Sequence, residues 1–308
     1  MTTVIGAPRV EDLGGGLYAY IQPDGSWMIN NTGFLVGSNG VVAIDTCSTE
    51  RRTRAFADTV ADLTSAPVHT LLNTHSHPDH TAGNGWFPGA TIVAHERTRA
   101  ELIATKDLPS MDGIFEPIDQ GEIPPAPPFL TYAQGVTLWV DDLRCEVRHV
   151  GTPAHTTNDS ILWVPERAVL YAGDLLFAGG TPFLLSGSIS GAIAVLIDVI
   201  APLDAETIVP GHGPVCGPET IDATLGYLRF VQDVARRGVE AGLSPLDAAR
   251  ETDLGDYAAW SETERIVGNL HRAYAEVRGA EPGAPIDIPA AFREMVIYNG
   301  GRPLTCRA

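Results

Sequence analysis

The stretch Asn73-Thr74-His75-Ser76-His77-Pro78-Asp79-His80 places three imidazoles and one carboxylate within six residues, directly after the apolar run of residues 68–72. This spacing follows neither a helical period nor a strand period, so we expect the four side chains to converge from a loop at the end of a strand. Neutral imidazole and carboxylate are natural ligands of Zn²⁺, and a catalytic zinc site keeps one coordination position open for water. The stretch therefore predicts a metal site.

One segment can hardly complete such a site, and three further candidates follow along the chain. His155 lies in Gly151-Thr152-Pro153-Ala154-His155-Thr156, Asp174 in Tyr171-Ala172-Gly173-Asp174, and His212 in Val209-Pro210-Gly211-His212-Gly213. Each segment adjoins a short β-like run, which would bring the three side chains to one edge of a sheet scaffold.

Together these segments resemble the metallo-β-lactamase superfamily of di-metal hydrolases, over about residues 17–213 and in the family's order. The resemblance implies an α/β fold, the four-layer αββα sandwich, with two Zn²⁺ ions per chain. Iron-using relatives often have a glutamate where His77 stands, which favours zinc over iron or manganese. The first ion would be held by His75, His77 and His155 and the second by Asp79, His80 and His212, with Asp174 bridging the two.

The implied pair of ions has a defined chemistry. Two metals roughly 3.5–4 Å apart share a bridging water whose pKa falls toward neutrality, and one of them also polarises a carbonyl. This suits the hydrolysis of a thioester, lactone or amide, with Asp79 and Asp174 as the expected catalytic side chains. Imidazole ligands need their second nitrogen oriented, and Asp45, Thr74 or backbone carbonyls are candidates. Asp45 has an alternative role as an N-cap or turn carboxylate for the following helix.

Other residues of similar chemistry are expected to lie outside the site. Four histidines fall outside the motifs, and a single histidine is more often structural than a ligand. Cys216 comes four residues after His212, but Asp174 already fills the bridging position, so we expect Cys216 to pack in the interior. The four histidines are His69, His95, His149 and His271.

The net charge of the sequence restricts which macromolecules the protein could bind. The formal charge of −18, from 20 basic and 38 acidic residues, disfavours nucleic acid. It would also repel an acidic acyl carrier protein, unless Arg51, Arg52 and Arg54 form a docking patch; the alternative for these arginines is a solvated helix face.

The N-terminus lacks signal-peptide features, no apolar run is long enough to span a membrane, and the four cysteines show no C-x-x-C spacing. We expect a reduced cytoplasmic protein.

Alternating strand and helix patterns predict a sheet scaffold covered by helices. We expect residues 1–217 to form the catalytic core and residues 218–308 a helical C-terminal extension, whose long amphipathic helices favour a homodimer. The proline-rich segment 106–131 is either a lid over the substrate or a plain connection. Strands are expected at 16–21, 33–37, 41–45, 68–73, 91–94, 135–140, 143–150, 160–164, 168–172 and 207–209, and helices at 49–64, 96–104, 192–200, 221–237, 245–250 and 263–278.

A finer resemblance concerns four segments, which are similar to the metallo-β-lactamase-fold cyclases of bacterial aromatic polyketide assembly, the second-ring type. This implies cyclisation with dehydration, or thioester hydrolysis, of a carrier-bound or free polyketide. Secreted class B β-lactamases carry other residues at the place of Asp174, which weighs against that branch. The segments are Thr181-Pro182-Phe183, residues 210–215 with 217–219, Asn269-Leu270-His271-Arg272-Ala273, and residues 298–301 with 304–306.

Two alternatives stand beside the cyclase. One is a general hydrolase of small thioesters or lactones with the same metal centre, and the other is a metal-binding or effector-sensing protein without activity. An apolar substrate would need an apolar wall, although each candidate residue has an alternative place in the core. The candidates are Trp27, Met28, Trp86, Phe115, Phe177 and Phe183.

Overall fold

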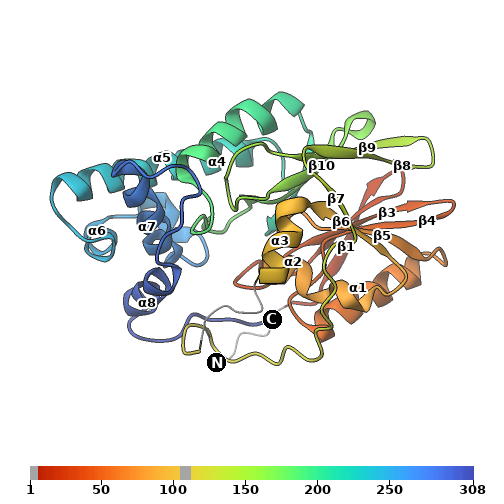
Figure 1. The fold of residues 1–308 in the computed structure, drawn as a ribbon, viewed down its shortest axis with the longest axis horizontal. Coiled ribbons are helices and arrows are strands. Elements are labelled where there is room, and N and C mark those ends of the chain that lie inside the picture. Colours follow the sequence, from red (N-terminus) through yellow and green to blue (C-terminus); the bar gives the residue numbers. More distant parts are fainter. Residues whose placement is uncertain (1–5, 105–111) are drawn as a thin grey trace.

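The computed structural model describes residues 6–104 and 112–308. Its two β-sheets pack face to face, and helices cover the outer face of each sheet (Figure 1). Side chains alternate between the two faces of a strand; on the central strands Val42 and Tyr171 enter the layer between the sheets, whereas Ala43 and Leu170 pack outward beneath helices. Three apolar layers thus separate four layers of structure, and the predicted αββα fold is confirmed.

The first sheet has seven strands in chain order. The first four strands pair antiparallel and the last three join them in parallel. A hairpin between two of the expected strands closes between Gly37 and Gly40, whereas the strands at residues 9–14 and 130–132 were not expected. The strands are β1 Arg9–Gly14, β2 Leu17–Ile21, β3 Thr32–Gly37, β4 Gly40–Ile44, β5 Val68–Leu72, β6 Thr91–His95 and β7 Leu130–Tyr132.

The second sheet has five strands in the order β12-β11-β10-β9-β8. Only β11 and β12 run parallel, and helix α4 with its short continuation to Ile200 connects them. Strand β11 is longer than the sequence predicts, since it continues through Asp174 to Phe177. The strands are β8 Gly135–Val140, β9 Leu143–His149, β10 Ser160–Val164, β11 Val169–Phe177 and β12 Thr207–His212.

The helices occupy the two outer layers. On the first sheet, Phe56 and Val60 of α1 pack against the strands. On the second, α4, α5 and α7 share one apolar cluster with β10 and β11. The helices are α1 Glu50–Leu63, α2 Pro78–Thr81, α3 Glu96–Ala104, α4 Ile189–Val195, α5 Glu219–Glu240, α6 Pro245–Glu251, α7 Arg265–Val277 and α8 Ile288–Tyr298.

The region after residue 217 is helical, as predicted, and α7 lies among α5, α6 and α8 (Figure 1). Its expected apolar face is buried at Ile266, Val267, Leu270 and Tyr274, but Val277 is exposed. The division at residue 217 and the homodimer stay predictions. Within the described ranges, every helix is too short or too polar to span a lipid bilayer.

Both interpretations of the arginines on α1, a docking patch and a solvated helix face, are wrong for Arg52. This side chain is buried, and its guanidinium donates to Gln22 Oε1 at 2.7 Å and to the Arg307 carbonyl at 3.1 Å. Helical geometry turns position 52 inward together with Phe56, so Arg52 lies neither on a docking patch nor on a solvated face. Arg51 and Arg54 are exposed, and Arg54 pairs with Glu50 and stacks on Trp86. Two apolar side chains of the same helix, Ala55 and Leu63, are exposed.

The proline-rich segment 106–131 is tied down in its described part. The Ile114 carbonyl accepts from the Leu304 N–H at 2.7 Å, and the Glu116 N–H donates to the Leu304 carbonyl at 2.9 Å. Farther along, the Glu122 N–H donates to Glu50 Oε2 at 2.7 Å. Residues 106–111 of this segment lie outside the described ranges, and a lid function stays a prediction.

Candidate metal centre

The ligand candidates reach one site from five places in the fold. His75 and His77 follow the end of β5, Asp79 and His80 lie on α2, and His155 lies in the connection from β9 to β10. Asp174 lies within β11 and His212 ends β12. The pairing of β11 with β12 shifts register around Gly173. Gly211 is required beside it, because a Cβ there would lie 1.8 Å from Asp174 Oδ1.

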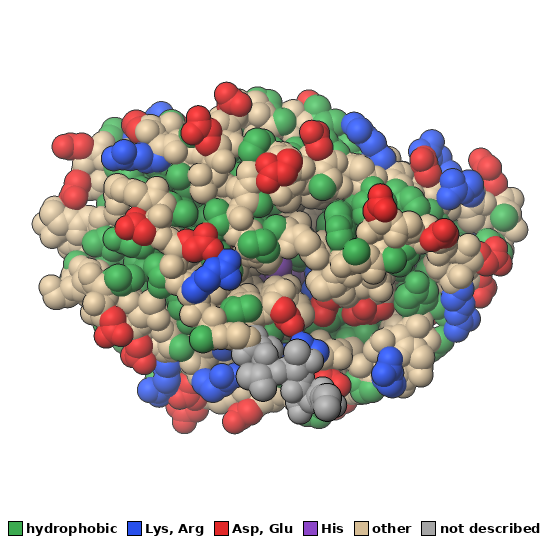
Figure 2. Space-filling model, turned by 180° about the vertical axis from the view of Figure 1, so that it is seen from behind, with side chains coloured by type: hydrophobic (Ala, Val, Ile, Leu, Met, Phe, Trp, Pro, Cys, Tyr) green, Lys and Arg blue, Asp and Glu red, His purple; other side chains and the backbone are tan. Residues whose placement is uncertain are grey.

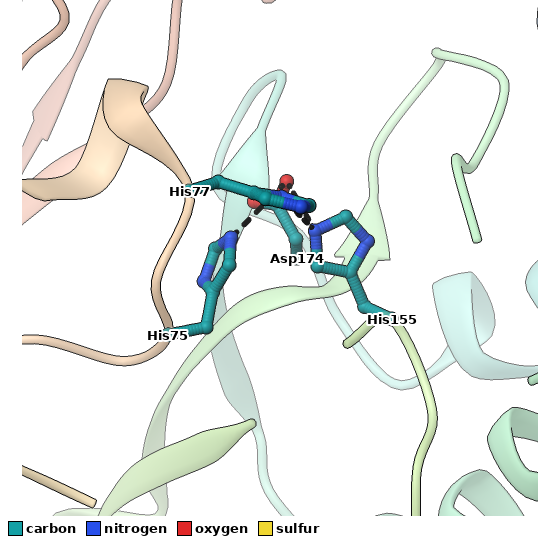
Figure 3. Close-up of side chains that lie close together, drawn as sticks. All are labelled: His75, His77, His155 and Asp174. Atoms are coloured by element: carbon teal, nitrogen blue, oxygen red, sulfur yellow. Dashed lines mark hydrogen bonds and ion pairs between the residues drawn. The ribbon is translucent and has the colours of Figure 1, made fainter. Parts of the chain in front are cut away.

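The first cluster comprises His75, His77, His155 and Asp174. One ligand atom from each lies within 4.8 Å of all the others. The Nε2 atom of His155 lies 3.4 Å from Asp174 Oδ2 and 2.8 Å from Nδ1 of His77, whereas Nε2 of His75 lies 4.0 Å from Asp174 Oδ2. Figure 3 shows the three imidazoles gathered around the carboxylate of Asp174.

The second cluster comprises Asp79, His80, His212 and the same Asp174. The Nε2 atom of His80 lies 3.0 Å from Asp174 Oδ1, and Nε2 of His212 lies 3.3 Å from both Asp174 Oδ2 and Asp79 Oδ2. Asp174 is therefore common to both clusters, the place the sequence predicts for a bridging carboxylate. All seven predicted ligand side chains are brought together.

A buried atom without a partner shows that this arrangement fits a cation. Within the described ranges, His75 Nε2 is buried and makes no hydrogen bond, whereas the equally buried His80 Nε2 and Asp174 Oδ1 face each other as an ion pair at 3.0 Å. Leaving a buried donor or acceptor unpaired costs about 1–3 kcal/mol, a cost that a bound cation would remove at His75. Imidazole and carboxylate are also the donor types that divalent metals such as zinc use.

Charge in the metal-free site is divided between the two clusters. Burial, together with neighbouring imidazoles, holds the pKa of His75 well below its usual value, and burial lowers the pKa of His155 to about 3. Burial acts in the same direction on His212, but Asp174 and Asp79 outweigh it and raise the pKa of His212 to about 9. The pKa of His80 is raised well above its usual value by Asp174 and Asp45 against the effect of burial. The first cluster therefore presents neutral imidazoles.

The second nitrogen of several imidazoles is fixed by a neighbour. Asp45 Oδ2 accepts from His80 Nδ1 at 2.8 Å, and the two oxygens of Asp45 accept from the backbone N–H and the hydroxyl of Thr74 at 2.7 Å each. Thr74 Oγ1 lies 3.0 Å from His75 Nδ1. Asp45 thus orients one ligand directly, and its alternative role as an N-cap is wrong because Thr49 caps α1.

Backbone carbonyls orient the other two ligand histidines that come later in the chain, His155 and His212. The Gly25 carbonyl accepts from His212 Nδ1 at 3.0 Å, and the Phe183 carbonyl accepts from His155 Nδ1. The sequence carries no signal for a backbone acceptor of this kind, since any residue provides a carbonyl. Backbone carbonyls were expected among the partners, but which carbonyls they would be could not be predicted.

Glu101 of α3 is a second feature that the sequence did not reveal. Its Oε2 accepts from Ser76 Oγ at 2.5 Å and its Oε1 from Thr157 Oγ1 at 2.9 Å. One carboxylate thus connects the loop that carries His75 and His77 with the loop that carries His155. On the sequence, Glu101 looks like any charged residue of a surface helix, and only the fold reveals its partners.

The six residues predicted to line the substrate site lie in different parts of the structure. Phe177 stacks on His212, with ring centroids 5.0 Å apart and an angle of 6° between planes, and therefore lies at the site. Trp27, Phe115 and Phe183 pack edge-to-face or tilted against one another and against Phe292, which makes them a shared aromatic core beside the site.

The other two wall candidates lie in different surroundings. Trp86 is half-buried on the α1 side of the first sheet, donates through Nε1 to the Glu122 carbonyl at 2.8 Å and stacks with Arg54. Met28 has a positive φ of 63° and its carbonyl accepts from Ser48 Oγ at 2.8 Å. Substrate contact by any of the six stays a prediction.

The histidines and the cysteine expected outside the site have other partners. His95 and His149 stack on each other, with centroids 3.9 Å apart, and each bonds a backbone carbonyl. His271 pairs with Glu294 at 2.7 Å. Cys216 exchanges backbone hydrogen bonds with Ile208.

Part of the molecular surface is hollowed near its middle. Figure 2 shows histidine surface at the bottom of this hollow, with hydrophobic and uncharged side chains next to it and Lys or Arg and Asp or Glu side chains close by. Charged side chains of both signs are spread over this face. An imidazole is thus visible from solvent.

Residues 25–212 match the family model described as the metallo-beta-lactamase superfamily. The chain is 31% identical over 185 residues to the 2,4-dinitroanisole O-demethylase subunit alpha of a Nocardioides species, a match that covers 57% of this chain and only 50% of the relative. It is 28% identical over 228 residues to a hydroxyacylglutathione hydrolase of Rhodospirillum rubrum, covering 72% and 77% of the two chains. Among solved structures, a metallo-beta-lactamase from Pontibacter korlensis superposes with a TM-score of 0.60 at 18% identity, over 72% of this chain and 99% of that one.

Proposed function

Because this chain belongs to the metallo-β-lactamase superfamily, we propose that its two His/Asp clusters hold two zinc ions and that it acts on an activated acyl substrate, with an aromatic polyketide thioester as the substrate class. The coarser assignment, a metal-dependent hydrolase, follows from the family match and the donor clusters. The observation that carries the proposal is the sharing of Asp174 between two clusters of ligand atoms. One residue common to two sites can bridge a pair of closely spaced ions.

The donor set assigns the ions to residues. His75, His77 and His155 would hold one ion, and Asp79, His80 and His212 the other, with Asp174 on both. The three neutral imidazoles of the first cluster suit zinc, a metal that favours nitrogen ligands. When bound, such a pair supplies a nucleophile from water at neutral pH and a Lewis acid for a carbonyl oxygen.

Asp79 is the side chain that we assign to proton movement. Burial raises its pKa, but His80 and His212 outweigh this effect and lower the pKa of Asp79 to about 2 in the metal-free protein. Its Oδ2 is therefore ionised at neutral pH and can accept a proton from water in hydrolysis. In a ring closure of the aldol type it could accept a proton from the carbon beside a carbonyl.

Two observations support a thioester substrate. The relative from Rhodospirillum rubrum, matched over most of both chains, is named for the hydrolysis of an acylated glutathione, which is a thioester. The segments that resemble the polyketide cyclases also lie close to the site: Phe183 orients His155, and Leu304 and Cys306 lie in the C-terminal tail that contacts Ile114 and Trp27. Cyclisation with dehydration, thioester hydrolysis, or both, would then act on one bound intermediate.

Hydrophobic side chains next to the exposed histidine surface support an apolar substrate. We propose Phe177 as the aromatic side chain that meets it, because this ring already stacks on His212. An acyl carrier protein as donor, a homodimer, and a cytoplasmic location are further parts of the proposal. With a formal charge of −18, docking of an acidic carrier would have to overcome repulsion.

The second candidate is a general hydrolase of small thioesters or lactones, which the likeness to the hydroxyacylglutathione hydrolase favours. The zinc-loaded protein would be given a simple S-acylglutathione and an N-acetylcysteamine thioester of an aromatic polyketide mimic. We expect a higher kcat/KM for the mimic. Fast turnover of the simple thioester with none of the mimic would overturn the polyketide assignment in favour of the second candidate.

The substitution His75→Ala tests the metal assignment on which both candidate functions depend. This imidazole is buried and its Nε2 faces Asp174, so we expect the variant to lose bound zinc and turnover together. His271→Ala is the matched control, because His271 pairs with Glu294 in the C-terminal helices. Full zinc content with full turnover in His75→Ala would contradict the assignment.

A further inference from the structure

One face of helix α7 is polar although it is buried. Arg265, Asn269 and Arg272 are spaced four and three residues apart, so they lie on the same side of the helix, and each is at most 2% exposed. Buried polar side chains require hydrogen-bond partners. All three find backbone partners in residues 181–185, the segment that follows β11.

The side-chain amide of Asn269 binds this segment at two points. Its Nδ2 donates to the Pro182 carbonyl at 2.8 Å, and its Oδ1 accepts from the Leu184 N–H at 2.9 Å. The same Nδ2 lies 3.1 Å from the hydroxyl of Tyr227 on α5. The amide therefore holds the backbone on both sides of Phe183.

The Leu184 N–H and the Phe183 C=O belong to a single peptide unit. In a trans peptide these two groups point in opposite directions, and here the C=O accepts from His155 Nδ1. The contacts therefore form one chain, from Asn269 Oδ1 through the peptide to His155 Nδ1. Fixing the proton on Nδ1 leaves the lone pair of His155 Nε2 directed at the first cluster.

The flanking contacts hold the segment without touching this peptide unit. Arg265 donates to the Thr181 carbonyl at 2.8 Å, and Arg272 donates to the Leu185 carbonyl at 2.7 Å. On the opposite side, the Ser188 N–H donates to the Ala154 carbonyl at 2.8 Å. The segment is thus enclosed between α7 and the loop that carries His155.

We propose that Asn269 is a positioning residue of the metal centre, which acts on His155 through the peptide unit between Phe183 and Leu184. The inference rests on the proposed metal centre. Buried hydrogen-bond chains strengthen one another, so Asn269 would set both the tautomer and the orientation of a ligand that it does not touch. The C-terminal helices would then be part of the metal centre and more than a cover for the second sheet.

The test compares Asn269→Ala with Tyr227→Phe. The first removes the acceptor for the Leu184 N–H, whereas the second removes only the hydroxyl bonded to the same amide. Loss of a partner outside the ligand shell typically lowers metal affinity about 10–100-fold, and we expect about tenfold for Asn269→Ala. We expect Tyr227→Phe to lower the melting temperature while its zinc affinity stays within twofold of wild type.

A second readout needs no metal. In the metal-free protein, ¹⁵N NMR of the imidazoles reports which nitrogen of His155 carries the proton; we expect the Nδ1–H form in wild type and Tyr227→Phe and a mixture in Asn269→Ala. Asn269→Leu keeps a side chain of similar size but offers the Leu184 N–H no acceptor, so the same mixture is expected from it if the alanine variant does not fold.

Two results would overturn the proposal. One is an Asn269→Ala variant with the wild-type tautomer and zinc affinity within twofold, and the other is an equal loss of affinity in Tyr227→Phe, which would mark a general loss of stability. A wild-type protein that binds no zinc would instead overturn the metal centre. The tautomer of His155 in the metal-free variants would still test the hydrogen-bond chain in that case.

Discussion

Substituting Asp45 by Asn perturbs the metal centre without changing the shape of the side chain. Asp45 is 2% exposed and lies in the left-handed region, with φ of 59°, a conformation that Asn also adopts readily. The carboxylate accepts three hydrogen bonds, from the N–H and hydroxyl of Thr74 and from His80 Nδ1. An amide can accept from the Thr74 N–H and donate to the Thr74 hydroxyl, but it cannot then accept from His80.

The size of the effect follows from that lost acceptor. A hydrogen bond to a charged group contributes about 1.5–3 kcal/mol, so the metal-free variant should lose about 2 kcal/mol in the free energy of unfolding. His80 would also be free to carry its proton on Nε2, the atom that faces Asp174. Loss of such an orienting partner typically lowers metal affinity about 10–100-fold.

The assay measures urea unfolding of the metal-free protein and zinc affinity by competition with a chromophoric chelator. The chain offers a matched control in Asp141, which also has a positive φ, of 52°, and also accepts from the N–H and hydroxyl of a single residue, Ser38. Asp141 is exposed on the turn between β8 and β9, so Asp141→Asn should leave zinc affinity unchanged. Wild-type affinity in Asp45→Asn, or an equal loss in both variants, would refute the reasoning.

Three further predictions concern the pH dependence of zinc binding, the pH dependence of stability, and the buried side chain of Arg52. Because the metal-free pKa of His212 is raised to about 9 and a ligand must be neutral, zinc affinity should rise with pH up to about 9, and zinc binding at pH 7 should release protons. Calorimetry in two buffers of different ionisation enthalpy checks this, and an enthalpy independent of the buffer would contradict it. The same shift, upward from the usual 6.5, stabilises the metal-free protein below pH 6.5, and this contribution should be lost as the pH rises toward 9. Arg52→Met removes the buried donor to Gln22 and Arg307 and should lower the free energy of unfolding by about 1–3 kcal/mol with zinc content unchanged. The exposed Arg51→Met should stay within about 0.5 kcal/mol of wild type, and equal stability of the two variants would show that the buried contacts contribute nothing.

The sequence was most informative where several residues of metal-ligand type lie close together in the chain. Four candidate ligands, His75, His77, Asp79 and His80, lie within six residues, a spacing that points to a metal site. The later candidates each lie in a short segment beside a strand that contains glycine or proline; they are His155, Asp174 and His212. Strand and helix periods likewise predict the layers, because burial of one face leaves a regular pattern. These are local signals, and the structure places them as predicted.

Contacts that depend on the packing of distant segments could not be predicted. Arg52 looks like a surface residue until α1 is laid on its sheet, and Glu101 gains its role only when two ligand loops meet at α3. The carbonyls of Gly25 and Phe183 carry no side-chain signal at all. Strand β1 is also weak in sequence, since it is an edge strand whose side chains are largely exposed.

The central claim is that two ions lie between two clusters that share Asp174. The most direct test is the zinc content of the metal-free protein after equilibration with Zn²⁺ and removal of the excess, measured by elemental mass spectrometry for wild type and Asp174→Ala. The account predicts two zinc ions per chain in wild type and a loss from both sites in the variant. A wild-type protein that holds one ion or none, or a variant that keeps both with unchanged affinity, would contradict it.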